Sequence, residues 1–152
     1  METMSEQVRD LVRAVLESDP RLPHADEVAV DADGGIVTLR GTVGTFAQLR
    51  AAVADARRVP GVTDVYDELD VRLLNDDRRK DAEIRGAALG RLVWDAELPG
   101  EDLDVHVKDG WVTLKGDVEH QYQSDAAFDD VARLHGVTGV TNEIKVVERL
   151  FP

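Results

Sequence analysis

The four histidines are the first residues to consider for metal binding or proton transfer, because the chain of 152 residues has no cysteine. They are His24, His106, His120 and His135. No two of them lie four residues apart, and neither an HExxH nor a CxxC spacing occurs. The pattern therefore favours ordinary surface histidines over metal ligands.

Other polar residues also lack the spacing of an active site. Ser124 has no nearby base and no nucleophile-elbow glycines. The acidic pairs Asp76-Asp77 and Asp129-Asp130 are interpreted as solvated faces rather than as paired catalytic carboxylates. The turn glycines precede strands rather than helices, which is not the arrangement of a phosphate cradle. We therefore expect no enzymatic activity, no cofactor and no bound metal.

Two tryptophans are candidates for contact with an apolar partner. Trp94 falls at the end of an expected helix and is predicted to pack in the core or between domains. Trp111 falls on the outer face of an expected strand. We favour burial of Trp111 at an interface between the two halves of the chain. Contact with a lipid headgroup zone or an apolar polypeptide is the alternative.

The formal net charge of −13 is shared by both halves of the chain. Residues 1–76 hold eight bases and fifteen acids, and residues 77–152 hold ten bases and sixteen acids. Nucleic acid is disfavoured as a partner because no basic face is available to displace its counterions. A strongly anionic bilayer is disfavoured for the same electrostatic reason.

The N-terminal sequence bears on the compartment. Residues 1–6 lack the basic and apolar regions of a signal peptide. We therefore expect a cytoplasmic protein, or a periplasmic or envelope protein if a leader has been trimmed from this chain. No run of the sequence approaches the ~18 apolar residues of a membrane span.

A nine-residue stretch occurs twice and indicates how the chain is organised. Residues 110–118 read GWVTLKGDV, and residues 35–43 read GIVTLRGTV. Apolar and polar residues alternate as in a half-buried strand, with Leu39 and Leu114 on the buried face. That face also carries a glycine, Gly41 or Gly116, which indicates a bulge or the close approach of another segment. The repeat predicts two domains, 5–74 and 77–150.

Each domain is expected to follow the order α-β-β-α-β. Ser5 is predicted to cap the first helix, whose apolar positions are Val8, Leu11, Val12, Val15 and Leu16. The second domain repeats this helix with Ile84, Ala88 and Leu92, and its later helix is expected over about residues 120–134. We predict an α+β fold in which each unit is a three-stranded mixed sheet with two helices on one face.

The two copies share residues at fixed spacings. The residues expected to have structural roles are Gly35, Leu39, Gly41 and Gly61 in the first copy, and Gly110, Leu114, Gly116, Gly136 and Asn142 in the second. Together with the Val-Thr-Leu and Gly-Val runs around them, they resemble the BON domain, named for bacterial osmotically induced and nodulation proteins. The first copy has Asp67 where the family usually has asparagine. The resemblance covers nearly the whole chain as a tandem pair.

The resemblance implies a non-catalytic binding role. BON proteins are associated with phospholipid surfaces, envelope maintenance, osmotic stress and periplasmic chaperoning, and one cytoplasmic type with a different second domain is associated with potassium. We therefore expect a stress-related module that associates with lipid surfaces or envelope components. A chaperone-like module that covers exposed apolar segments and a small-ion (potassium) sensor are the alternatives.

The outer face of each sheet is the expected binding surface. The candidate residues are Trp111, Thr113, Lys115 and Lys145 in the second unit and Ile36 in the first. Large apolar residues on an uncovered sheet usually mark an interface. We expect Ile36 and Trp111 to be partly covered by the other unit or, in a homodimer, by a second chain. The expected partner of the free surface is a phospholipid surface or another protein.

Overall fold

The computed structural model describes residues 3–74, 78–98 and 103–147, which form two units of the same plan. The boundary between the two compact units falls between Arg72 and Leu73. The predicted limits 5–74 and 77–150 stay predictions, because residues 75–77 and 148–152 lie outside the described residues.

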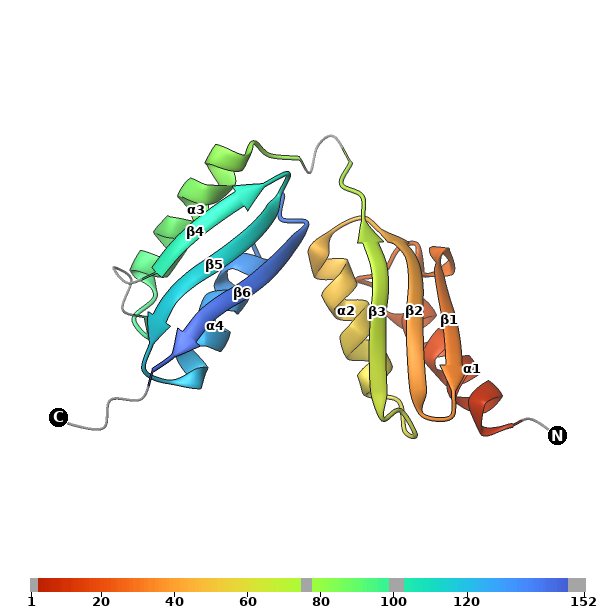
Figure 1. Cartoon of the computed structure of the whole chain (residues 1–152). Helices are drawn as coiled ribbons and strands as arrows, with labels where there is room; N and C mark the ends of the chain where they lie inside the picture. The colour runs from red at the N-terminus through yellow and green to blue at the C-terminus, as the bar shows by residue number, and fades with distance from the viewer. Residues whose placement is uncertain (1–2, 75–77, 99–102, 148–152) are drawn as a thin grey trace. The chain divides into compact units, whose positions relative to one another are not determined.

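Each unit is a three-stranded sheet with two helices. The elements of the first unit are α1 (Met4–Ser18), the short 3-10 helix η1 (Ala25–Glu27), β1 (Val28–Asp33), β2 (Ile36–Val43), α2 (Phe46–Arg57) and β3 (Asp64–Val71). Those of the second are α3 (Asp81–Trp94), β4 (Leu103–Lys108), β5 (Trp111–Val118), α4 (Gln121–Ala132) and β6 (Gly139–Val146) (Figure 1).

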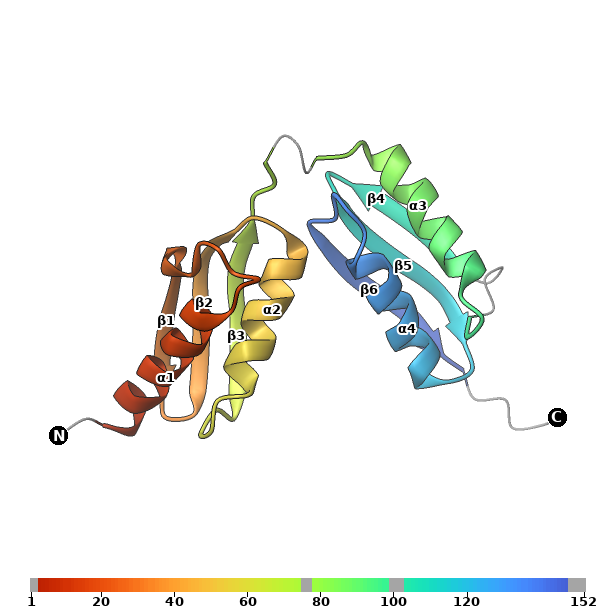
Figure 2. The same cartoon turned by 180° about the vertical axis from the view of Figure 1, so that it is seen from behind.

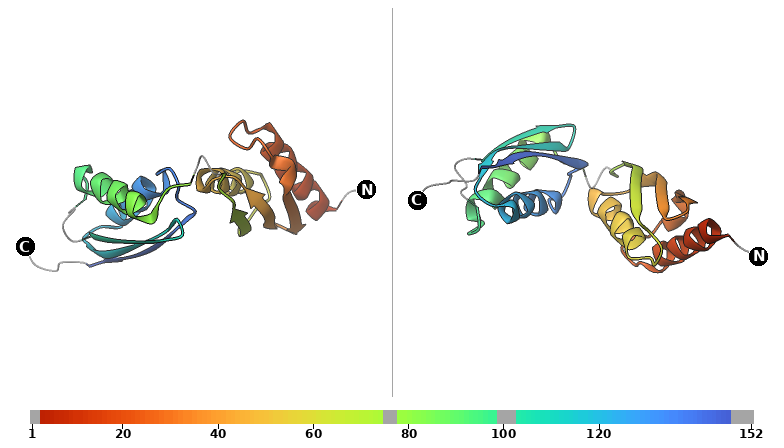
Figure 3. Two further views of the ribbon diagram at one scale, coloured as in Figure 1. Left: turned by 90° about the horizontal axis from the view of Figure 1, so that it is seen from above. Right: turned by 60° about the horizontal axis from the view of Figure 1, so that its bottom comes forward.

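The strand pairing confirms the predicted mixed sheets. The first two strands of each unit pair antiparallel, and the second and third pair parallel, so β2 and β5 are central. Both helices of a unit cover the same face of its sheet, and the other face is left without a helix (Figures 2 and 3). A two-residue turn joins the first and second strands of each unit, and an α-helix joins the second strand to the third. These connections explain the pattern, because a parallel neighbour requires a long connection.

The central strands supply the middle of each core. Leu39 and Leu114 are fully buried, as are Val37 and Val112 two residues before them. In the first unit the residues of β2 belong to one cluster with Val12 of α1 and the alanines of α2. The alternation in the repeated stretch therefore predicts the buried face correctly.

The glycine within each central strand allows a close backbone approach. Gly41 has a φ of +127°, and a Cβ at this position would overlap the carbonyl oxygen of Glu27. Gly116 has the equivalent φ of +139°. Since L side chains rarely adopt this conformation, both the backbone angle and the approach of η1 require glycine at Gly41.

The predicted cap of the first helix is wrong by two residues. The side chain of Thr3 accepts from the backbone N–H of Glu6 and caps α1. Ser5 lies inside the helix, and its Oγ accepts from the N–H of Gly34 at 2.8 Å. Asp81 occupies the same place at the start of α3 and accepts from both residues of the second hairpin turn, at 2.9 and 3.0 Å. The first helical turn thus fastens the hairpin.

Two further helix predictions need correction. Leu11 was expected on the buried face of the first helix but is 49 % exposed, because Val8, Val12 and Leu16 fill the contact with the sheet. The last helix covers Gln121–Ala132 rather than residues 120–134, since the N–H of Leu134 turns back to Val131 in a tighter turn.

Asn142 connects β6 to α4. Its Nδ2 donates to the Oγ of Ser124 at 2.9 Å, and its Oδ1 accepts from the N–H of Ile144 at 3.1 Å. Asp67 is the equivalent residue of β3, and its Oδ1 likewise accepts from the N–H of Leu69 at 2.9 Å. A carboxylate has no N–H to donate, so Asp67 forms the strand contact without the link to the helix.

The buried central leucines give a test of the fold. Replacing Leu114 with Ala should reduce the free energy of unfolding by about 2–5 kcal/mol, because the surrounding core can collapse only partly around the cavity. Urea unfolding followed by circular dichroism measures this loss. Replacing the half-exposed Leu11 with Ala is the matched control and should change stability by less than about 0.5 kcal/mol. Equal effects of the two replacements would contradict the assigned register.

Candidate functional site

The outer face of the second sheet brings four of the predicted binding residues onto one surface. Trp111, Thr113 and Lys115 alternate along β5 and point away from the helices. Lys145 lies on the neighbouring strand β6, opposite Asp117. Ile36, the fifth candidate, belongs to the sheet of the first unit.

Trp111 lies across the sheet surface and does not extend freely into solvent. The register places it opposite Gly139 of β6, and a Cβ on that glycine would overlap the indole ring. The indole Nε1 donates to Thr141 Oγ1 at 2.7 Å. The side chain is 49 % exposed. The ring is therefore fixed, its polar group is satisfied, and much of its apolar surface faces outward.

Charged residues occupy the outer positions of this sheet in equal numbers, with Lys108 opposite Trp111 and with Asp117 and Lys145 at the far ends of their strands. The bases of the outer strand positions are Lys108, Lys115 and Lys145, and the acids are Asp104, Asp117 and Glu143. The Lys115 ammonium lies 3.7 Å from the Glu143 carboxylate, and the His106 Nε2 lies 3.2 Å from Asp104. A surface pair of this kind contributes little to stability and leaves the lysine accessible.

A shallow hollow of about 700 Å³ opens beside the indole. It is lined by His106, Val107, Lys108, Asp109, Trp111, Thr113 and Thr138. The sequence predicted that Trp111 and Thr113 lie on the outer face, where the structure has them, and their binding role stays a prediction. It did not single out Lys108 and Thr138. It also missed Gly139, whose role follows from the register between β5 and β6 and not from any local pattern.

The corresponding face of the first unit differs in charge. Ile36 is 40 % exposed and lies opposite Asp64, and the exposed Tyr66 lies opposite Thr38. Arg40 pairs with both Asp31 and Glu68. The predicted coverage of Ile36 and Trp111 by the other unit or by a second chain stays a prediction, since each unit is described by itself.

The predicted core packing of Trp94 is wrong. This side chain ends α3 and is 88 % exposed, and its neighbour Val93 is exposed as well. The inward positions of α3 are taken by Ile84, Ala88 and Leu92, which leaves the last residue of the helix outside the core. Burial of Trp94 at a contact with another domain is not tested.

The predicted solvated pair at 129–130 is wrong for Asp130. Its Oδ2 is inaccessible to solvent and has no hydrogen-bond partner in the described part of the chain. Burial raises the pKa of this carboxyl to about 6, and the neighbouring carboxyl of Asp95 adds to the increase. Asp76 and Asp77 lie outside the described residues, so the prediction for that pair stays a prediction.

His120 and Ser124 make contacts with neighbouring side chains. His120 stacks on Tyr122 with ring centroids 5.3 Å apart. Ser124 is buried and accepts from Asn142. Within residues 3–74, 78–98 and 103–147, no three His, Cys, Asp or Glu side chains are grouped so that they could hold a metal ion. The chemistry that the site offers is therefore apolar contact combined with lysine and hydroxyl hydrogen bonding.

This repeated α-β-β-α-β plan is that of the BON domain, whose sequence pattern matches residues 5–72 and 80–148. The chain belongs to the BON domain family. A curated relative is osmotically-inducible protein Y of Escherichia coli (strain K12), which is 34 % identical over 138 residues. The matched region is 88 % of this chain and 68 % of that protein.

Two solved structures resemble the chain more distantly. Both are of CdsD, a structural protein of the type III secretion system of Chlamydia trachomatis. The TM-scores are 0.41 and 0.39 at 15 % and 16 % sequence identity. The matches cover 95 % and 93 % of this chain but 64 % and 66 % of the CdsD chains. At this distance the likeness says nothing about function.

The helices were also considered as possible membrane spans. None of those formed by the described residues is long and apolar enough to cross a bilayer.

The hydrogen bond between the Trp111 indole and Thr141 gives a second prediction. Replacing Thr141 with Val removes the acceptor of the indole N–H, so the ring should become more mobile and more exposed. Trp94 is first replaced with Phe, which leaves Trp111 as the single tryptophan. We expect increased quenching of its fluorescence by acrylamide and emission at longer wavelength.

Thr113 is the control for this experiment, because it lies on the same face without bonding the indole. Equal quenching after Thr113→Val and Thr141→Val would contradict the described position and hydrogen bond of the indole. The same measurement at increasing protein concentration tests the predicted coverage by a second chain, which should protect Trp111 as concentration rises.

Proposed function

We propose that this protein is a non-enzymatic, stress-related binding module that associates with lipid surfaces through the outer sheet face of its second unit. The observation that supports this most strongly is the half-exposed, immobilised indole of Trp111 on a sheet face without a helix. Tryptophan is favoured at the boundary between headgroups and acyl chains, where an apolar ring and a satisfied N–H both find a suitable environment.

The two units of the chain provide an internal comparison. The outer positions of the described strands in the first unit hold one base, Arg40, and five acids. Those acids are Asp31, Asp33, Asp64, Glu68 and Asp70. The second unit holds three bases and three acids in the equivalent positions. Headgroup phosphates would be repelled by the first face and would meet lysines on the second.

Trp94 is the competing anchor within the same unit. Asp81 at the start of α3 contacts the turn that precedes Trp111, so the far end of this 14-residue helix lies about 21 Å away. Trp94 and Trp111 also belong to opposite layers of the unit, which means that one flat surface cannot contact both. Trp94 is followed by Asp95 and Glu97, whereas Lys108 lies opposite Trp111 in the strand register, and this favours Trp111.

The other functions stay alternatives. The likeness to an osmotically inducible protein supports the association with stress. The hollow beside Trp111 could accept an apolar side chain and supports a chaperone-like module that covers exposed segments. A potassium sensor and the homodimer also stay predictions. We also propose a cytoplasmic location, with the periplasm or envelope as the alternative. The compartment that contains the lipid surface would decide between them.

Vesicle binding tests the proposed surface. The full chain is sedimented with zwitterionic vesicles and with vesicles that contain a minor fraction of anionic lipid. Trp111→Ala should weaken binding about fivefold to tenfold, since the exposed half of an indole contributes roughly 1–1.4 kcal/mol on burial. Replacing Lys108, Lys115 and Lys145 with Gln should remove the preference for anionic lipid.

Trp94→Ala is the matched control because it removes the other exposed tryptophan. Loss of binding in Trp94→Ala with none in Trp111→Ala would show that the end of α3 is the anchor. No sedimentation with either vesicle type, together with suppressed aggregation of a reduced unfolded protein, would replace lipid association with the chaperone-like function.

A further inference from the structure

A pair of aspartates joins the two helices of each unit. In the first unit Asp19 caps the end of α1, and Asp55 lies on α2. In the second unit Asp95 caps the end of α3, and Asp130 lies on α4. The two pairs occupy the same places in the repeat, so they are two versions of one structural feature.

The members of these pairs on α2 and α4 have buried oxygens. Asp55 is 3 % exposed. Its Oδ2 and the Oδ2 of Asp130 lie out of contact with solvent and have no hydrogen-bond donor within the described residues. Burying an ionised carboxylate oxygen without a donor is costly, and such groups in folded proteins call for an explanation.

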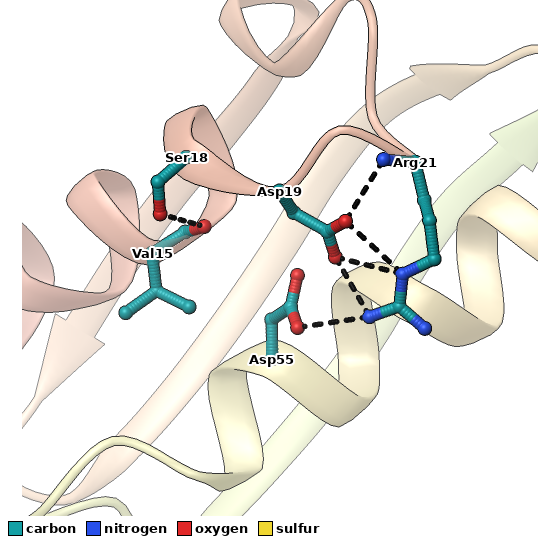
Figure 4. Close-up of polar contacts among 5 residues, drawn as sticks. All are labelled: Val15, Ser18, Asp19, Arg21 and Asp55. Carbon is teal, nitrogen blue, oxygen red and sulfur yellow. Dashed lines mark hydrogen bonds and ion pairs between the residues drawn. The ribbon is translucent and has the colours of Figure 1, made fainter.

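In the first unit the polar group that faces Asp55 is another carboxyl. Asp19 accepts from the backbone N–H, the Nε and the Nη2 of Arg21 at 2.9, 3.0 and 2.7 Å, and is therefore ionised. The same Nη2 donates to Asp55 Oδ1 at 3.2 Å. Figure 4 shows the other oxygen of Asp55 turned toward Asp19. Two carboxyl groups can share a hydrogen bond only when one of them holds a proton.

The second unit forms the pair without the arginine. Glu97 stands where the first unit has Arg21, and its backbone N–H donates to Asp95 Oδ1 at 2.9 Å. Asp95 and Asp130 hold the places of Asp19 and Asp55 in the repeat, and Asp130 Oδ2 is likewise buried without a donor among the described residues. The guanidinium of Arg21 is thus found in the first unit alone, whereas both units have the two carboxyls.

We propose that one proton, shared by the two aspartates of each pair, is a structural component that fastens the end of the first helix of the unit to its second helix. Without this proton two carboxylates face each other in a partly buried site, and their repulsion loosens the helix end and the loop that follows. Each unit therefore contains a clasp that responds to proton concentration.

The pKa values of the four carboxyls agree with this geometry. Burial, followed by the hydrogen bond with its partner, raises the pKa of Asp55 to about 6, and the same causes raise the pKa of Asp130 to about 6. The hydrogen bond from Arg21 holds the pKa of Asp19 well below its usual range. The hydrogen bond with Asp130 lowers the pKa of Asp95.

Cations near the pairs oppose the raised pKa values without cancelling them. The charges of Arg21 and Arg58 act on Asp55, and those of Arg91 and Arg133 act on Asp130. Each favours the ionised form of the nearby carboxyl, but burial and the partner carboxylate have the larger effect. Loss of the proton above the raised pKa is consequently the step that opens the clasp.

The direction of the pH dependence follows from comparison with an unfolded aspartate, whose pKa is 3.8. The raised pKa of Asp55 or Asp130 contributes stability that is complete below 3.8 and is lost as the pH rises through about 6. The lowered pKa of Asp19 or Asp95 contributes stability above the unfolded value, which is lost as the pH falls through the folded one. The clasp is therefore firmest between the lowered pKa of Asp19 or Asp95 and the raised pKa of about 6 of Asp55 or Asp130. It loosens in neutral and alkaline solution.

Asparagine variants of the full chain test the proposal. Asp55→Asn and Asp130→Asn keep an N–H donor for the partner carboxylate and cannot ionise. Backbone hydrogen exchange and thermal unfolding are measured from about pH 5 to about pH 8, where the raised carboxyls titrate. A pKa raised by about two units corresponds to roughly a hundredfold change in the folded-to-unfolded ratio, so each variant should gain at least tenfold in protection of its own unit at about pH 8.

Asp125→Asn is the matched control, because Asp125 lies on α4 but is exposed and bonds Gln121. It should follow the wild type at every pH, and the four histidines are the same in every variant. A carbon NMR titration of the aspartate carboxyls gives an independent measure even if a variant folds poorly. The proposal is overturned if every aspartate titrates below about pH 5, or if the asparagine variants lose as much protection at about pH 8 as at about pH 5.

Discussion

Each unit depends on burying one face of its central strand beneath two helices. Leu39 and Leu114 lie at the middle of that contact and are inaccessible to solvent. A unit of about seventy-five residues can bury only a small core, and in the first unit the buried residues of the helices and outer strands pack around this strand. Since two helices can cover only one side of a three-stranded sheet, the same requirement leaves the opposite side open, and the candidate binding surface lies there.

The repeat also allows the units to be compared with each other. The buried positions agree closely between them, whereas the exposed ones have diverged: Trp111 stands in the place of Ile36, and Gly139 in the place of Asp64. The change from Asp64 to Gly139 removes a charge and creates the space in which the indole lies. These two differences on adjacent strands place a fixed aromatic ring on the second face without altering the strands themselves.

Much of the fold could be predicted from the sequence because alternation and helical spacing report burial directly. The order of elements, the buried leucines and the outward direction of Trp111 all follow from these periods. Features that depend on tertiary contacts could not be predicted in this way. Ser5 bonds a hairpin 29 residues away instead of capping its helix, and Trp94 lies beyond the last buried turn of α3. Asp130 looked like part of a solvated face because the carboxyl that meets it comes from another helix.

The hydrogen bonds of Asn142 and Asp67 to their own strands have a consequence for how these molecules behave at high concentration. Val147 donates to β5 and Arg72 donates to β2, so the N–H groups of Ile144 and Leu69 point to the free side of their strands. Those are the groups that an incoming strand from another molecule would use to extend the sheet. Because a side chain of the same strand already accepts from each of them, β6 and β3 offer a poor template for edge-to-edge polymerisation. One N–H on the outer edge of β6 and one on that of β3 are thereby occupied before another molecule approaches.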